Sequence, residues 1–295
     1  MTQLVENVKA LALKEGVNRT PLAGVRVYKT SRNLERAPLC YRQGVIFVVQ
    51  GRKRIFIDNQ GYDYNPDNYL VLTLPMAAEC ETLVETGKPM LSLMIDLDLG
   101  MLGEMVRVID EFGRSSVTDK LSDAKGMYVS RCTEHLASAV TRLTACLKSP
   151  MESSLLGQGL VREVIYHLLC GPQAAPLFSL VSYNTHLSRL EKVLNHLHGH
   201  YQESLDVDQL ADMANMSTSS FHRNFRLVAA SSPKQYVKKL RLNRARELLL
   251  DQGFKVKQAA AEVGYESPTQ FSREFKRYFG MSPQEFGREP GVAPV

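Results

Sequence analysis

Tryptophan is absent from this chain of 295 residues, and no apolar run approaches the roughly 18 residues that span a membrane. The first residues lack the basic start and the apolar core of a secretory signal. These absences predict a protein that has no membrane partner and works in the cytoplasm. Hydrophobic residues make up 44% and charged residues 23% of the chain, as in ordinary folded proteins, and the length allows two domains.

Paired cysteines and clustered histidines are also missing. The number of cysteines is odd and none lies in a Cys-x-x-Cys pair, so neither a disulfide framework nor a zinc knuckle is indicated. Residues 1–134 contain no histidine, which argues against a metal site there, and we expect no cofactor. Free thiols leave redox sensing open, with Cys40 and Cys80 as candidates. His196 and His200 have the spacing of two metal ligands, but a polar helix end explains them better.

The N-terminal half has the pattern of a small antiparallel β-structure. Residues 1–20 read as an amphipathic helix, and residues 22–96 then alternate short strands with tight turns. Residues 45–49 are apolar on both faces, as in a strand buried on both sides. The close spacing of strands and turns predicts a barrel or sandwich. The basic triplet at 52–54 is interpreted as a charged hairpin that keeps a sheet edge soluble rather than as a nucleic-acid patch.

Residues 97–170 read as helices. Apolar residues recur at near-heptad spacing over 136–147, and a second apolar stripe covers 156–168. An antiparallel pair of such helices suits either packing on the protein's own core or a seam between two copies of the chain. Residues 171–184 begin with Gly-Pro and contain few packing residues, so we expect them to form a linker.

An imperfect repeat organises the C-terminal third of the chain. Five residues recur 50 positions later with the same identity: Ser217/Ser267, Phe221/Phe271, Arg223/Arg273, Phe225/Phe275 and Pro233/Pro283. A repeat of this period indicates one supersecondary unit used twice. Each copy has a short helix with inward alanines, a turn and a serine-capped helix, which predicts a helix-turn-helix. We expect Asn215 in the first turn and Gly264, as the counterpart of Ala214, in the second.

The two units are joined by a predicted helix over 233–250, which begins at a Ser232 cap. Its length of about 27 Å is close to the roughly 34 Å of one turn of B-DNA, so it suits two reading heads in successive major-groove segments. Residues 181–295 also carry +4 of the net charge of +5. Phosphate binding and simple solvation are equally open for the basic side chains of this helix, Lys238, Lys239, Arg241 and Arg244.

These patterns resemble the AraC family of bacterial regulators in two places. In the N-terminal half the resemblance lies in Val49-Gln50-Gly51-Arg52-Lys53, Asp67-Asn68-Tyr69-Leu70 and Leu74-Pro75, and it implies a cupin-like sensor. In the C-terminal part it covers residues 185–288 and implies a DNA-binding domain with two helix-turn-helix units. The family's base-contact positions fall on Ser219, His222, Arg223, Thr269, Gln270 and Arg273, and Arg226 and Lys276 lie on the same polar faces.

The resemblance implies an α+β fold in two domains. Residues 1–175 would form a cupin-like β-barrel with a helical hairpin, for sensing and dimerisation, and residues 185–288 an all-α DNA-binding domain. The implied function is sequence-specific regulation of transcription. The implied partners are double-stranded promoter DNA, a second copy of the chain, a small-molecule or stress signal and, for an activator, RNA polymerase. The alternatives are a thiol- or aldehyde-responsive redox regulator of the same architecture and a cupin-type enzyme, for which no catalytic residues or metal ligands are evident.

Overall fold

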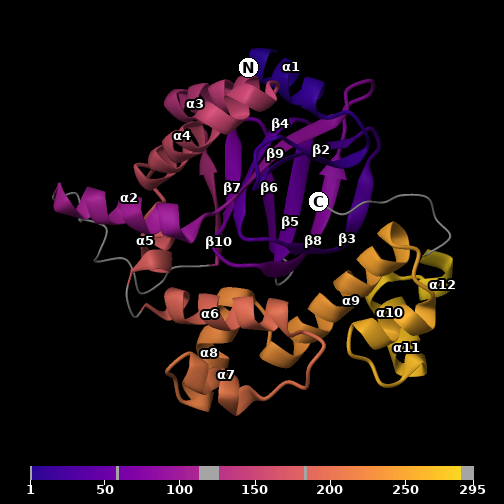
Figure 1. The fold of residues 1–295 in the computed structure, drawn as a ribbon. Coiled ribbons are helices and arrows are strands. Elements are labelled where there is room, and N and C mark those ends of the chain that lie inside the picture. Colours follow the sequence, from indigo (N-terminus) through magenta and orange to yellow (C-terminus); the bar gives the residue numbers. More distant parts are fainter. Residues whose placement is uncertain (1, 58–59, 113–125, 183–184, 287–295) are drawn as a thin grey trace.

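The structure is a computed structural model that describes residues 2–57, 60–112, 126–182 and 185–286 (Figure 1). Ten strands lie between residues 16 and 131, and the described residues after 133 contain only helices. The predicted α+β class, a β-structure with a helical hairpin followed by an all-α part, is therefore confirmed.

The elements have the following bounds. The strands are β1 Gly16–Arg19, β2 Val25–Thr30, β3 Leu34–Tyr41, β4 Gly44–Gln50, β5 Arg52–Ile57, β6 Gln60–Tyr64, β7 Asn68–Leu72, β8 Met76–Leu83, β9 Met90–Asp96 and β10 Met127–Arg131. The helices are α1 Thr2–Leu11, α2 Leu99–Glu111, α3 Glu134–Cys146, α4 Pro150–Leu169, α5 Ala175–Val181, α6 His186–Gly199, α7 Val207–Met213, α8 Thr218–Ala229, α9 Pro233–Asp251, α10 Val256–Glu262, α11 Pro268–Phe279 and α12 Pro283–Phe286.

Two antiparallel sheets enclose an inner core. The larger has the strand order β1-β2-β9-β4-β7-β10 and the smaller the order β3-β8-β5-β6. Side chains of both sheets, such as Ile46 and Leu70 from one and Ile55 and Tyr64 from the other, form a single buried cluster between them. Strand β4 lies inside the larger sheet and is buried on both faces, as predicted for residues 45–49, because helices cover the side that the smaller sheet does not.

The interpretation of the basic triplet is wrong for Lys53. Strand β5 alternates between its two faces, so Arg52 is exposed and Arg54 pairs with Asp63 at 2.9 Å, whereas Lys53 is 0% exposed. Successive side chains of a strand point to opposite faces of the sheet. Because one face of the smaller sheet meets the inner core, the middle residue of the triplet has to point inward.

Helices α1 to α5 lie along the outer face of the larger sheet (Figure 1). The helices predicted within 131–170 are confirmed as α3 and α4. Two other predictions need correction. The first helix ends at Leu11, and the chain becomes a strand at Gly16, which has a φ of +83°. Strand β10 interrupts the expected helical stretch, because pairing with β7 satisfies the hydrogen bonds of its short apolar segment.

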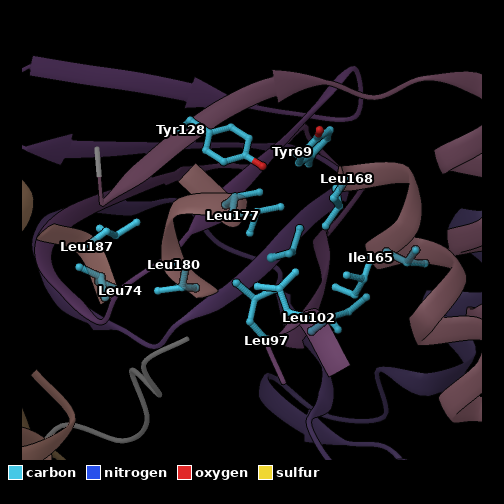
Figure 2. Close-up of a cluster of buried hydrophobic side chains, with 14 of the residues drawn as sticks. Tyr69, Leu74, Leu97, Leu102, Tyr128, Ile165, Leu168, Leu177, Leu180 and Leu187 are labelled. Atoms are coloured by element: carbon cyan, nitrogen blue, oxygen red, sulfur yellow. The ribbon is translucent and has the colours of Figure 1, made fainter. Parts of the chain in front are cut away.

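The expected linker contains a packed helix, α5. Its Leu177 and Leu180 are buried beside Tyr69, Leu168 and Leu187 in the cluster drawn in Figure 2. The Gly-Pro pair that suggested a linker lies just before α5, and a proline occupies the helix's first turn, where its missing N–H is tolerated. The cluster continues from α5 into α6, so the core is shared across the predicted boundary. The domain limits 1–175 and 185–288 stay a prediction.

Helix α9 is docked on the smaller sheet. The Tyr236 hydroxyl donates to the Pro75 carbonyl oxygen, which directly precedes β8, at 3.0 Å. The same hydroxyl lies 2.7 Å from Nε2 of His198 in α6, so the ring nitrogen donates to it. Further along α9, Arg246 donates to the Pro38 carbonyl oxygen of β3 at 3.3 Å. Three polar contacts therefore tie α9 to the strands and to α6.

The turn of the second helix-turn-helix unit packs against the loop that follows α6. Arg241 of α9 donates to the main-chain oxygens of Tyr201 at 2.6 Å, Glu203 at 2.6 Å and Gly264 at 3.0 Å. Gly264 has a φ of +80°, and a Cβ atom there would lie 2.2 Å from the carbonyl oxygen of Gln202. The position therefore admits only glycine.

We expect Gly264→Ala to destabilise the protein by about 3 kcal/mol, because the added methyl group meets the Gln202 carbonyl and the backbone is left-handed. Gly280→Ala is the matched control: its φ is +83° with open space around the Cβ position, and Ala230, 50 residues earlier, already holds a φ of +49°. The control should lose about 1 kcal/mol. Chemical denaturation followed by circular dichroism measures both, and equal losses would contradict the close packing at Gly264.

The half-buried His198 predicts a loss of stability in acid. Burial, helped by the nearby charges of Arg244 and Arg42, lowers the pKa of His198 to about 4. The unfolded chain, with an ordinary value of about 6.5, therefore binds this proton first. The contribution of neutral His198 to the free energy of unfolding is complete above pH 6.5 and is lost as the pH falls toward 4. We expect the wild type to lose about 2 kcal/mol more than His198→Gln between pH 7 and pH 4. Exposed His200→Gln should behave as the wild type; if all three titrate alike, the assignment is wrong.

Candidate nucleic-acid interface

The two helix-turn-helix units align with two different offsets. The second helices, α8 and α11, lie 50 residues apart, whereas the first helices, α7 and α10, lie 49 apart. The left-handed turn residues Asn215, with a φ of +50°, and Gly264 are also 49 apart. The second unit thus has one additional residue, Glu266, between its turn and the Ser267 cap. Gly264 is the counterpart of Asn215, and the prediction that paired it with Ala214 is wrong.

The second helix of each unit is held as predicted. Ser217 Oγ accepts a hydrogen bond from the Ser220 N–H at 3.4 Å, and Ser267 Oγ accepts one from the Gln270 N–H at 3.2 Å. These contacts satisfy N–H groups that have no partner within the helix. In each unit the two phenylalanine rings lie 5.5 Å apart and are fully buried: Phe221 with Phe225, and Phe271 with Phe275.

All eight side chains predicted to contact DNA are exposed. They lie on the faces of α8 and α11 that the buried phenylalanines leave to solvent: Ser219, His222, Arg223 and Arg226 on α8, and Thr269, Gln270, Arg273 and Lys276 on α11. The structure therefore gathers the predicted residues into two exposed polar faces, one in each unit. Their contact with DNA stays a prediction.

Two polar side chains of these faces form hydrogen bonds with partners three or four residues away. Arg223 donates to Ser220 Oγ at 3.5 Å, and Gln270 donates to Glu274 at 3.4 Å. Both contacts are long and exposed, so they are readily exchanged for groups on a ligand. A guanidinium reads guanine O6 and N7, and a carboxamide reads adenine N6 and N7. The two faces are therefore equipped to recognise base edges.

Two basic residues of α9 serve the fold. Arg241 donates hydrogen bonds to the three main-chain oxygens described above. Arg244 forms an ion pair with Glu247 and lies 5.9 Å from the ring centroid of Tyr201. These contacts favour a structural role for both over phosphate binding. Lys238 and Lys239 are partly buried.

A cleft of about 990 Å³ lies at the junction of the strands and α9. Arg26 and Asp96 in its lining form an ion pair. The other charged residues that line it are Lys14, Glu15, Arg19, Arg42 and Glu247. Despite that pair, burial raises the pKa of Asp96. These residues belong to segments far apart in the sequence, so no local pattern announced them. The cleft can hold a molecule of small-ligand size.

The two candidate thiols lie in different surroundings. Cys40 is partly buried beside α9, and burial raises the pKa of its thiol to about 12. Such a thiol stays protonated at neutral pH, which does not favour thiolate chemistry. Cys80 is buried between the two sheets.

His196 and His200 lie next to each other at the end of α6. The rings of His196 and His200 stack with centroids 4.3 Å apart, and His200 Nδ1 lies 3.0 Å from the His196 carbonyl oxygen. Within the described ranges, no three His, Cys, Asp or Glu side chains come together as a metal site would require. No described helix is long and apolar enough to cross a membrane.

Known proteins resemble the chain along most of its length. The HTH-type regulator GbdR of Pseudomonas aeruginosa is 31% identical over 38% of this chain and 30% of its own length. The thermoregulatory protein LcrF of Yersinia pestis is 24% identical over 83% of this chain and 88% of its own. Several curated relatives, GbdR among them, are matched over only about a third of their length.

Solved structures share the fold. ToxT from Vibrio cholerae, in a structure with a bound unsaturated fatty acid, superposes with a TM-score of 0.62 at 12% identity and covers 92% of this chain and 97% of its own. Residues 210–289 match the family model of a helix-turn-helix domain. Residues 21–176 match the model described as the N-terminus of AraC-type transcriptional regulators. Since that match covers more than half of the chain, the chain belongs to the AraC-type transcriptional regulators.

Proposed function

We propose that this protein is a transcription regulator that binds double-stranded promoter DNA through α8 and α11 and takes a small-molecule effector in its N-terminal part. The observation that carries the proposal is the matched exposure of eight polar side chains on two helices whose phenylalanines are fully buried. Both helices follow a turn made by a left-handed residue, which is the geometry that presents a second helix to the major groove.

The effector part of the proposal rests on the cleft beside α9. A molecule bound there would touch both the strands and Glu247 of α9, the helix that carries the two units. ToxT, which shares the fold, has been solved with an unsaturated fatty acid bound. The protein acts in the cytoplasm as a regulator rather than as an enzyme, and as an activator it would contact RNA polymerase at the promoter. GbdR, one of the relatives named above, is itself an HTH-type transcriptional regulator.

A homodimer through α4 is part of the proposal. Met151, Leu155 and Leu156 of this helix are 69%, 76% and 57% exposed. On the same face, Gly159 has open space where a Cβ would lie, so another helix can approach closely. Since α3 packs against α4 and α1 packs against α3, this apolar face of α4 is left for a second copy of the chain.

Alanine substitutions at the two repeated arginines test DNA contact. We expect Arg223→Ala and Arg273→Ala each to weaken binding to a cognate promoter by about 1–3 kcal/mol, because each removes a guanidinium from an exposed recognition face. Gel shifts with specific and scrambled DNA measure the loss, which should be larger on the specific fragment. Lys9→Ala, which removes one positive charge from exposed α1, should bind as the wild type does. Unchanged affinity in both arginine variants would refute the contact assignment.

The dimer face is tested by adding a charge to it. We expect Leu155→Glu to weaken self-association by about 2–3 kcal/mol, since it replaces a leucine that would be buried between two copies. Sedimentation velocity over a range of concentrations measures the change. Leu13→Glu is the control, because Leu13 is 86% exposed and lies after α1, outside α4. A dimer that forms equally well in both variants would place the interface elsewhere.

A further inference from the structure

One lysine is enclosed between the two sheets. Lys53 of β5 is 0% exposed, and among the described residues its Nζ atom has no hydrogen-bond partner. Nζ lies over the ring of Tyr28, at 4.7 Å from the ring centroid. An ammonium without a counter-ion is poorly tolerated in such a place, and burial lowers the pKa of Lys53. The side chain is therefore poised to be an uncharged amine.

The groups around this amine are hydroxyls and a thiol. Tyr64 lies directly across from Lys53 on β6, and its hydroxyl is 3.1 Å from that of Tyr41. Cys80 lies on β8, diagonal to Lys53 on the same face of the sheet. We name the set the Lys53 cluster; it consists of Lys53, Tyr28, Tyr41, Tyr64 and Cys80. The apolar inner core surrounds it.

The Lys53 cluster borders the cleft beside α9. Tyr41, Ile46 and Met94 belong to the inner core and also line the cleft. A rotation of these side chains would admit a small molecule from the cleft to the cluster. The same apolar surroundings would exclude a strongly charged molecule unless it brought its own compensation.

The chemistry of a buried, uncharged amine narrows the class of ligand. An anion would need the ammonium form, which burial disfavours. A neutral amine in an apolar enclosure has a free lone pair and adds to carbonyl carbon. We propose that Lys53 is the attachment site of a small uncharged aldehyde or ketone, held as an imine inside the β-structure.

The reaction is balanced without a further reagent. The Nζ lone pair forms the bond to the carbonyl carbon, and a proton passes from nitrogen to the carbonyl oxygen. Loss of water then removes that oxygen together with both amine hydrogens and leaves the C=N bond. Tyr64, which lies across from Lys53 and whose hydroxyl is 3.1 Å from that of Tyr41, is the group we assign to pass this proton once the ligand is bound. Nothing is oxidised or reduced.

The regulatory meaning of this site rests on the proposed function, and the smaller sheet supplies the coupling. Strand β8, which pairs with the Lys53 strand, begins directly after Pro75, whose carbonyl accepts the hydrogen bond of Tyr236 in α9. An imine enlarges the side chain at position 53 within a filled core. The strands then have to shift, and α9, which carries both helix-turn-helix units, is docked on them.

Reductive trapping on the full-length protein tests the proposal. Butyraldehyde is the probe, sodium cyanoborohydride converts an imine into a stable N-butyl amine, and peptide mass spectrometry locates the product. We expect Lys53 to be labelled at least about tenfold more than exposed Lys88, because each unit by which a pKa falls raises the uncharged amine fraction tenfold. Prior denaturation should remove this preference. Equal labelling of the two lysines in the folded protein, or labelling of Lys53 only after denaturation, overturns the proposal.

Variants and gel shifts separate this proposal from the function above. Lys53→Arg places a charged guanidinium at this position and forms no imine, and Lys53→Met removes the amine. In whichever variant folds, butyraldehyde should no longer change promoter binding, whereas it should change that of the wild type. A probe response that persists in a folded variant overturns the regulatory role of Lys53. Trapping at Lys53 in a protein that binds no promoter DNA supports the imine site and overturns the proposed function instead.

Discussion

The geometry of the whole C-terminal part depends on the guanidinium of Arg241. This single side chain donates to main-chain oxygens of two separate segments, the loop after α6 and the turn at Gly264. It therefore fixes the second helix-turn-helix unit against the first, and Gly264 provides the only backbone that fits so close to Gln202. A DNA-binding protein with two reading heads needs a fixed spacing between them, because successive major-groove segments have a fixed spacing.

The two halves of helix α9 pack into two different hydrophobic cores. Residues of its first half, such as Tyr236 and Leu240, pack into the core of the strands and the first unit, while Leu242 and Leu249 pack into the second unit. The helix cannot tilt as a rigid rod without disturbing both cores. Its hydrogen bonds to Pro75 and Pro38 attach it to the start of β8, which neighbours the strand that holds Lys53, and to β3 on the other side of β8. A change inside the β-structure therefore has a direct route to the two heads.

The sequence predicted what depends on local chemistry. A serine cap, a phenylalanine pair four residues apart and a proline at a helix start each act within one helix, so α8, α11 and their exposed faces followed from the letters alone. The inward direction of Lys53 was missed because the orientation of a strand depends on which sheet it joins. The cleft was missed because Arg26, Asp96 and Glu247 meet only in the folded chain. The offset of 49 between the first helices of the two units was missed because the five identical residue pairs all lie after the turns.

The two helix-turn-helix units differ in the core that holds each of them in place. Phe221 and Phe225 belong to the same buried cluster as the strands and helices of the N-terminal part, and a Cβ at Gly126 would lie 2.6 Å from the Val228 carbonyl oxygen of α8. The second unit instead has its own small core around Phe271 and Phe275. A unit with a separate core can open or move without breaking the larger one. The first unit is thus positioned by the strands and helices of the N-terminal part, whereas the second is held through α9, through Arg241 and by contacts of α11 with β3. A signal that shifts α9 would change the spacing of the heads chiefly by moving the second, while the first keeps its place on the strands.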